Sequence, residues 1–286
     1  MKIYRNEPMA PHTTFRIGGR AQRLFELCSH DDLRELRDTL NGKMDRVFFL
    51  GKGSNLLIRE GKVMTPFVRL AGDFLDLSFD ESSVTAGGAV PMPELAMKSA
   101  RKNFYGLEWA AGVPGSVGGA VMMNAGAFEH ETYERLQSVR VMDREGEIYD
   151  IPSEDIDFDY RFCGLRDDYL ILEATFQLEP APADAAMDNT RTLIEKRRNQ
   201  QPVGHPSAGC IFKNGKDFYA AELIDRAGLK GESEGQIYVS EQHANYMINR
   251  GDGSYQDVLR LIELVRDRIS EEFDKELELE LCVVDE

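Results

Sequence analysis

Hydrophobic residues recur at helical spacing in several parts of the chain. The first pattern predicts a helix that begins at a capping box formed by Ser29 and Asp32 and ends at Gly42. Similar patterns predict a helix over residues 93–103, one between the 179–186 tract and Pro202, one over 218–228 and one starting at 254. Gly228 is expected to terminate the helix over 218–228, and Ser254 with Asp257 is expected to cap the helix that starts at 254.

Apolar runs between these helices predict strands. They cover residues 47–50, 56–58, 136–143, 147–151 and 170–178, and alternating Leu and Glu predict a closing strand over 277–284. The tract 179–186, rich in Pro and Ala, is the best linker candidate. A chain of 286 residues has room for two or three domains.

Two glycine-rich segments are the most distinctive local features. Gly51-Lys52-Gly53-Ser54-Asn55 stands between apolar runs, where backbone N–H groups can approach an anion such as a pyrophosphate. It is neither a Walker A motif nor GxGxxG, so on its own a turn without a ligand is favoured. In Gly112–Gly126 the density of glycine and proline argues against a regular core helix or strand. The interspersed residues are Val, Ala and Met, which argues against a flexible surface loop. Together the segments predict a two-part cradle for a large cofactor with a diphosphate tail.

The candidate acid–base residues are weak signals individually. A lone cysteine such as Cys210 is usually an inert core residue, although the small neighbours and Lys213 suit an accessible thiol. Glu278 and Glu280 share one side of the closing strand, where a solvated edge is the favoured interpretation. Arg161 is more often a surface or ion-pair residue than part of a site.

Composition narrows the class of protein. Fifty acidic and 34 basic residues give a net charge of −16, which disfavours a nucleic-acid partner. The four cysteines are too scattered for a disulfide framework or a CxxC metal site, and neither a signal segment nor an 18-residue apolar run occurs. We therefore expect a cytoplasmic protein with no metal and no membrane or nucleic-acid partner.

Six segments occur in one order along the chain: Thr13–Gly19, Gly51–Ile58, Gly106–Phe128, Tyr160-Arg161, Pro206–Asn214 and Val239–Asn245. In this order they resemble the UDP-N-acetylenolpyruvoylglucosamine reductases of peptidoglycan synthesis, and the resemblance spans nearly the whole chain. No long insertion follows Tyr160, so the chain resembles the shorter type without the substrate-capping loop.

The resemblance implies an α+β fold. A two-lobed FAD-binding domain of the vanillyl-alcohol-oxidase (PCMH) type, with lobes over 1–70 and 71–180, is expected to precede a C-terminal α+β substrate-binding domain over 187–286. FAD and NADPH are the implied cofactors, and the implied protein is a monomer acting on small molecules. Flavin contacts are implied at Gly51, Lys52, Gly53, Ser54, Asn55, Leu56, Gly112, Val113, Pro114, Gly115, Ser116, Gly118, Gly119, Asn124 and Gly126.

The resemblance also implies a reaction. NADPH reduces FAD, and the flavin N5 then gives a hydride to C3 of the enolpyruvyl group of UDP-N-acetylglucosamine enolpyruvate, which yields UDP-N-acetylmuramate. Cys210 stands where the family usually has a serine and is implied to protonate C2; a thiol is a stronger acid than an alcohol. Arg161 is implied to stabilise charge on the carboxylate, and Glu280 to polarise it, with a pKa raised by burial.

Four further positions match the family's substrate site: Tyr160, Lys213, Asn214 and His243. His243 could equally satisfy a buried backbone carbonyl. The chain departs from the family's common closing segment at Leu279 and Cys282, where a proline and an arginine are usual.

Two other interpretations stay open at this point. One is an oxidase or dehydrogenase of the same flavoprotein fold that acts on a hydroxylated small molecule without NADPH. The other is a flavin- or nucleotide-binding module without catalysis, against which the presence of both Arg161 and Glu280 argues.

Overall fold

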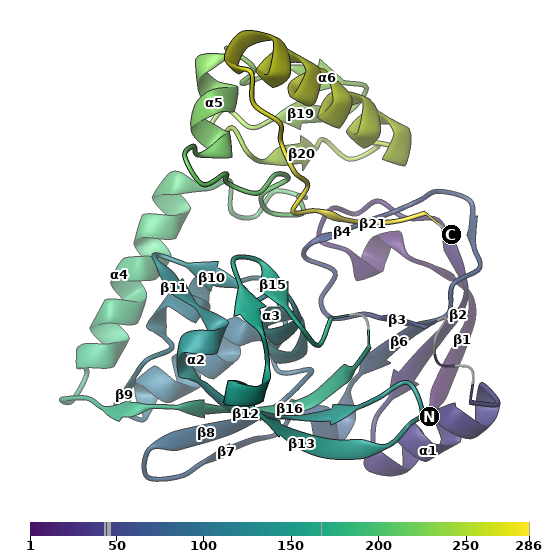
Figure 1. The fold of residues 1–286 in the computed structure, drawn as a ribbon, viewed down its shortest axis with the longest axis vertical. Coiled ribbons are helices and arrows are strands. Elements are labelled where there is room, and N and C mark those ends of the chain that lie inside the picture. Colours follow the sequence, from purple (N-terminus) through teal and green to yellow (C-terminus); the bar gives the residue numbers. More distant parts are fainter. Residues whose placement is uncertain (43, 45–46, 167, 286) are drawn as a thin grey trace. The chain divides into compact units, whose positions relative to one another are not determined.

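The computed structural model describes residues 1–42, 44, 47–166 and 168–285 (Figure 1). Contacts divide the chain into two compact units. Unit 1 consists of Met1–Arg5, Arg23–Lys52 and Thr65–Lys196, and unit 2 of Asn6–Gln22, Gly53–Met64 and Arg197–Glu286. The units are interleaved along the chain, and the predicted consecutive domains 1–70, 71–180 and 187–286 stay a prediction.

An antiparallel five-stranded sheet is the centre of unit 1 (Figure 1). In spatial order its strands are β13 (Ile148–Pro152), β12 (Leu136–Met142), β16 (Leu170–Gln177), β8 (Ser83–Gly87) and β7 (Leu77–Phe79). The strands predicted over 136–143, 147–151 and 170–178 are confirmed within a residue or two. In β16, Leu170–Leu172 are all buried because cores lie on both faces of the strand there, and burial alternates from Glu173 onwards.

Helices α2 (Met92–Arg101) and α3 (Val117–Met122) pack against this sheet and share its apolar core. The prediction that the glycine-rich segment forms no regular helix is wrong at α3. A Cβ on Gly118 would lie 3.2 Å from the Gly88 carbonyl oxygen and 3.4 Å from that of Ile171. The missing side chain therefore lets the helix backbone lie close to the sheet.

A second core in unit 1 lies between α1 (His30–Thr39) and a set of parallel strands. These are β2 (Arg20–Leu27), β6 (Phe67–Leu70) and β3 (Phe48–Phe49), with β1 (Lys2–Pro8) next to β2. The capping box of Ser29 and Asp32 forms as predicted. The strand expected over 47–50 is reduced to β3.

The tract expected as a linker belongs to unit 1. Its first residues form β17 (Glu179–Pro180), which pairs with β9 (Phe104–Tyr105), and α4 (Ala185–Gln200) follows. The remaining short strands of this unit are β10 (Gly126–Ala127), β11 (His130–Glu131), β14 (Phe158–Asp159) and β15 (Phe162–Cys163). Short 3-10 helices occur at Ala10–His12, Gly72–Leu75, Glu108–Gly112, Thr132–Arg135 and Ser153–Asp155.

In unit 2, α5 (Ala220–Arg226) and α6 (Tyr255–Phe273) share one apolar core with a three-stranded antiparallel sheet (Figure 1). The sheet consists of β18 (Ser233–Glu234), β19 (Ile237–Val239) and β20 (Met247–Asn249). The capping box at Ser254 is confirmed, and Gly228 follows α5 with a φ of +68° as a C-terminal cap requires. None of the described helices is long and apolar enough to cross a membrane.

The chain's final strand pairs with a strand from its first quarter. β21 (Cys282–Val284) runs parallel to β4 (Leu56–Ile58), and β5 (Lys62–Val63) pairs with the start of β2. The strand predicted over 277–284 is regular only in β21. Before it, one carbonyl, that of Ile211, accepts hydrogen bonds from the backbone of both Glu280 and Leu281, which interrupts the ladder.

Candidate active site

The two glycine-rich segments meet within unit 1. A Cβ on Gly51 would lie 2.8 Å from the Ser116 Oγ and 3.9 Å from the Gly119 Cα. Apart from its chain neighbours and the backbone of α3 itself, a Cβ on Gly119 would have one described atom within 4 Å, the same Ser116 oxygen at 3.4 Å. The Ser116 hydroxyl also caps α3 by accepting from the Gly119 N–H. This surface without side chains fits a cofactor that must approach the backbone closely.

The second half of the first loop belongs to unit 2. Gly53 has a φ of +63°, and a Cβ there would lie 2.1 Å from the His12 carbonyl oxygen. The Gly53 carbonyl accepts from the Thr14 N–H (3.1 Å), and the Thr14 hydroxyl donates to the Ser207 carbonyl (2.7 Å). Three of the six sequence segments therefore meet at Thr14.

Asn55 connects this loop to the end of the chain. Its Nδ2 donates to the Glu280 carbonyl (2.9 Å), and its own carbonyl accepts from the Cys282 N–H (3.0 Å). The backbone around the candidate residue Glu280 is thus fixed by the predicted cofactor loop.

Cys210 begins a short extended segment between two others in unit 2. On one side Cys210 forms a β-bridge with Tyr246; on the other, Phe212 forms one with Leu279. The carbonyl of Ile211 accepts from the Glu280 N–H at 2.9 Å. Cys210, which is partly exposed, and Glu280 consequently lie on neighbouring hydrogen-bonded segments.

Asn245 holds the backbone next to Cys210, a role that sequence analysis did not predict. Its buried amide donates to the Phe212 carbonyl (2.8 Å) and accepts from the Phe212 N–H (3.0 Å), while its backbone carbonyl accepts from Ile211. Its position inside the Val239–Asn245 motif was the available signal, but its partner lies 33 residues away in the sequence.

Arg161 lies in unit 1, in the two-residue turn between β14 and β15. Its φ of +55° is unusual for a residue other than glycine. The guanidinium stands over the Tyr160 ring, 5.0 Å from its centroid, and its Nη2 lies 3.5 Å from the Gly126 carbonyl oxygen. The turn therefore brings Arg161 next to the second glycine-rich segment.

The other predicted substrate residues have partners in unit 2. Lys213 forms an ion pair with Glu278 (2.6 Å), and the Asn214 Oδ1 accepts from the Ala220 N–H at the start of α5 (3.0 Å). The Glu278 side chain is well exposed, as the solvated-edge interpretation predicted for it. Substrate contacts of Lys213 and Asn214 stay predictions.

His243 does not use its Nδ1 for a buried carbonyl, which was the alternative to a role in the site. Among the described residues this buried nitrogen has no hydrogen-bond partner. The imidazole ring packs edge-on against the Tyr246 ring, with 4.9 Å between the ring centroids. Burial lowers the pKa of His243, and the positive charges of Lys230 and Arg197 act in the same direction. These effects favour the neutral form of His243.

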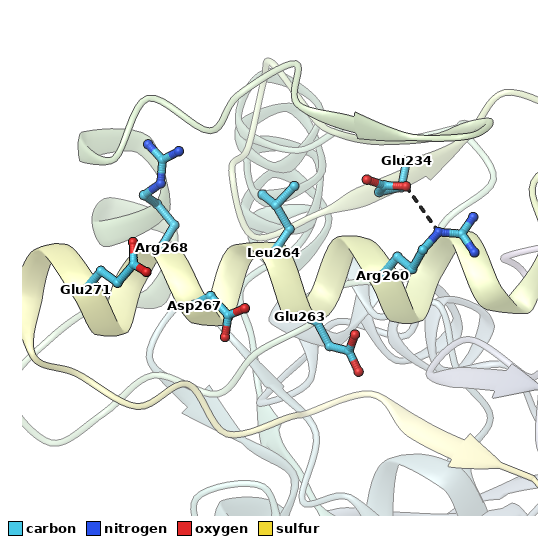
Figure 2. Close-up of a pocket in the computed structure, with 7 residues that line it drawn as sticks. All are labelled: Glu234, Arg260, Glu263, Leu264, Asp267, Arg268 and Glu271. Atoms are coloured by element: carbon cyan, nitrogen blue, oxygen red, sulfur yellow. Dashed lines mark hydrogen bonds and ion pairs between the residues drawn. The ribbon is translucent and has the colours of Figure 1, made fainter.

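An open depression on α6 lies apart from these residues. Its lining comes from the exposed side of the helix and from β18, and Arg260 is paired with Glu234 across it (Figure 2). The lining residues are Glu234, Arg260, Glu263, Leu264, Asp267, Arg268 and Glu271. None of the predicted site residues takes part, so we assign it no chemistry.

Comparisons with known proteins support a cofactor-binding part and a C-terminal part of the chain. A model of FAD binding domains matches residues 21–152, and a model of the UDP-N-acetylenolpyruvoylglucosamine reductase C-terminal domain matches residues 201–284. Reductases of that name from Clostridium botulinum and Clostridium tetani are 35% and 34% identical to this chain, with 98% of this chain and 92% of the relative covered. The crystal structure of the Thermus caldophilus enzyme (MurB) has a TM-score of 0.84 and 31% identity, covering 99% of this chain and 98% of that one.

The fold and the matched domains define an FAD-dependent oxidoreductase with a flavin domain of the vanillyl-alcohol-oxidase type. The chain belongs to the UDP-N-acetylenolpyruvoylglucosamine reductase family of peptidoglycan synthesis. NADPH is the reductant of that family. These findings set aside the interpretations as an oxidase of hydroxylated molecules and as a module without catalysis.

Proposed function

We propose that this chain reduces the enolpyruvyl group of UDP-N-acetylglucosamine enolpyruvate with NADPH, and that Cys210 supplies the proton. Family membership over nearly the whole chain, together with Cys210 and Glu280 on adjacent segments, supports the proposal. FAD bound here would supply the hydride chemistry that connects NADPH to C3 of the substrate. The glycine surface at Gly51 and Gly119 of unit 1 would hold this cofactor. The flavin contacts at Gly53–Leu56 stay predictions.

Proton delivery is the task we assign to Cys210. As the C3–H bond forms, the electron pair of the double bond moves towards C2 and the substrate carboxylate. The Cys210 S–H bond then breaks, the proton goes to C2, and the thiolate is reprotonated from water. General acid catalysis of this kind contributes about 10²- to 10⁴-fold in rate.

Charge stabilisation is the task of two other side chains. We assign Arg161 to the substrate carboxylate, because a guanidinium pairs with it through two parallel hydrogen bonds. Glu280 would polarise the same carboxylate in its protonated form, which requires a raised pKa. Tyr160, Lys213, Asn214 and His243 would line the site.

Half-reactions measured separately test this proposal. Cys210→Ala should leave the bleaching of the flavin by NADPH within about twofold of wild type and slow its reoxidation by the enolpyruvyl substrate by about 10²-fold or more. Cys210→Ser should recover much of this loss. Cys28→Ala, at a partly exposed cysteine of unit 1, is the control and should change neither rate. Reoxidation by Cys210→Ala at the wild-type rate would contradict the proton-donor role.

A further inference from the structure

Asn124 is a fully buried amide whose hydrogen bonds connect three segments of unit 1. Its Nδ2 donates to the Asp159 carbonyl (3.0 Å) and to the Glu131 Oε2 (2.9 Å). Its Oδ1 accepts from the Tyr133 N–H (3.2 Å). The flavin contact predicted at Asn124 stays a prediction, but its side chain already has partners within the protein.

The Asp159 carbonyl is the partner that matters for chemistry. Asp159 is the last residue of β14, two positions before Arg161, and the β14–β15 hairpin contains only the pairs Phe158–Cys163 and Asp159–Phe162. So short a hairpin is not stable on its own. Its turn also places Arg161 at positive φ, a conformation that persists only where surrounding contacts impose it.

We propose that Asn124 is the positioning residue for Arg161: it fixes the turn that carries the guanidinium, so that this group is ready for the substrate carboxylate. The inference rests on the proposed function, since it assumes the role of Arg161 given above. An amide suits the position because one end must donate to two oxygen acceptors while the other accepts from an N–H. An aspartate would turn an acceptor towards the Asp159 carbonyl and the Glu131 carboxylate.

The test uses the FAD-loaded full chain with Asn124→Asp, in the wild-type and Arg161→Ala backgrounds. In the wild-type background, flavin reoxidation by the enolpyruvyl substrate should slow about 10- to 100-fold, since small misplacements of a catalytic group have effects of this size. In the Arg161→Ala background the same substitution should change the rate by about twofold at most. The flavin absorption spectrum and the thermal unfolding midpoint report whether each variant folds and binds FAD.

Asn249→Asp is the matched control. Asn249 is equally buried and donates to the Phe15 carbonyl while accepting from the Gly251 N–H, but it lies in unit 2. Any effect it has on reoxidation should be the same factor in both backgrounds. Asn124→Ser, which retains a polar group, replaces Asn124→Asp if that variant does not fold.

The outcomes separate the two proposals. An equal slowing by the Asn124 variant in both backgrounds would overturn the positioning role, because its effect would then not pass through Arg161. If Arg161→Ala alone reoxidises at the wild-type rate, the role assigned to Arg161 under the proposed function is wrong, and the positioning role falls with it. The rate of Arg161→Ala alone therefore distinguishes a wrong role for Arg161 from a wrong positioning role for Asn124.

Discussion

Asn245 is a buried amide that fixes the backbone beside Cys210 through both hydrogen bonds to Phe212. Asn245→Asp keeps the acceptor for the Phe212 N–H but turns a second acceptor towards the Phe212 carbonyl. We expect the unfolding free energy to fall by about 1–3 kcal/mol, measured by denaturant titration. Gln22→Glu, at an exposed amide of β2, is the control and should stay within about 0.5 kcal/mol of wild type.

Glu26 gives unit 1 a pH-dependent contribution to stability. Burial would raise the pKa of its carboxyl, but hydrogen bonds from Lys2 and Arg69, and their charges, lower it below the ordinary 4.5. The charged form is therefore favoured by folding, so this stability is present above pH 4.5 and is lost as the pH falls towards the lower folded pKa.

The pH dependence can be isolated with Glu26→Gln. The difference in unfolding free energy between wild type and Glu26→Gln should be largest near neutral pH and should shrink as the pH falls below 4.5. Glu60→Gln, at an exposed position, should show a small difference at every pH. A difference for Glu26→Gln that grows on acidification would contradict the sign of the shift.

Asn124 and Asn245 show which roles the sequence alone does not reveal, since Asn124 was named only as a flavin contact and Asn245 only as part of a motif. Their partners Asp159 and Phe212 lie 35 and 33 residues away, and no local spacing indicates such pairings. Cys210 could be named because it falls within an ordered motif, and Glu280 because it matches the family's C-terminal glutamate. Their adjacency through Ile211 could not be predicted. A residue that supports another is recognised only when the fold has brought both together.

At the level of elements, the capping box of α6 is expected to contribute measurably to stability. The Ser254 Oγ accepts from the Asp257 N–H (3.1 Å), and the Asp257 Oδ2 accepts from the Ser254 N–H (2.9 Å). Ser254→Ala should lower the unfolding free energy by about 1 kcal/mol. Ser270→Ala, at an exposed position inside the same helix, should be neutral or slightly stabilising because alanine favours helices.

Gly228, after α5, offers a test of backbone strain free of steric effects. Its φ is +68°, and a Cβ at this position would have no atom within 4 Å. Gly228→Ala should therefore lose about 1 kcal/mol of stability from the left-handed backbone alone. Gly228→Asn should lose less, since asparagine tolerates this conformation, and equal losses in the two variants would contradict the explanation.

Helix ends were predictable because their signals are local. Capping boxes and the terminal glycine identify α1, α5 and α6 within a few residues of sequence. Helix α3 was missed because its glycines disfavour a helix locally, while the contact of Gly118 with the Gly88 and Ile171 carbonyls comes from the distant sheet. Close packing against the sheet outweighs the local propensity there.

At the scale of the whole chain, the ordered motifs gave the family and its α+β class, but not the interleaving of the two units. Residues 6–22 and 53–64 pack with the C-terminal third, for example where β4 pairs with β21. Parallel pairing between strands more than 220 residues apart leaves no mark in hydrophobic periodicity. The glycine segments illustrate the same limit, since the contact of Gly51 with Ser116 links positions 65 residues apart.

FAD binding should raise the stability of the apoprotein through the glycine surface at Gly51 and Ser116. A ligand that binds only the folded state at about 100 times its dissociation constant adds about 2.7 kcal/mol. In Gly51→Ala the new methyl group would lie 2.8 Å from the Ser116 Oγ and block the close approach, so titration with FAD should raise the thermal midpoint much less. Gly42→Ala, whose φ is +71° with no atom near the added methyl, should destabilise the apoprotein yet keep the full FAD-dependent increase. A full increase in Gly51→Ala as well would show that FAD does not depend on close approach at this glycine.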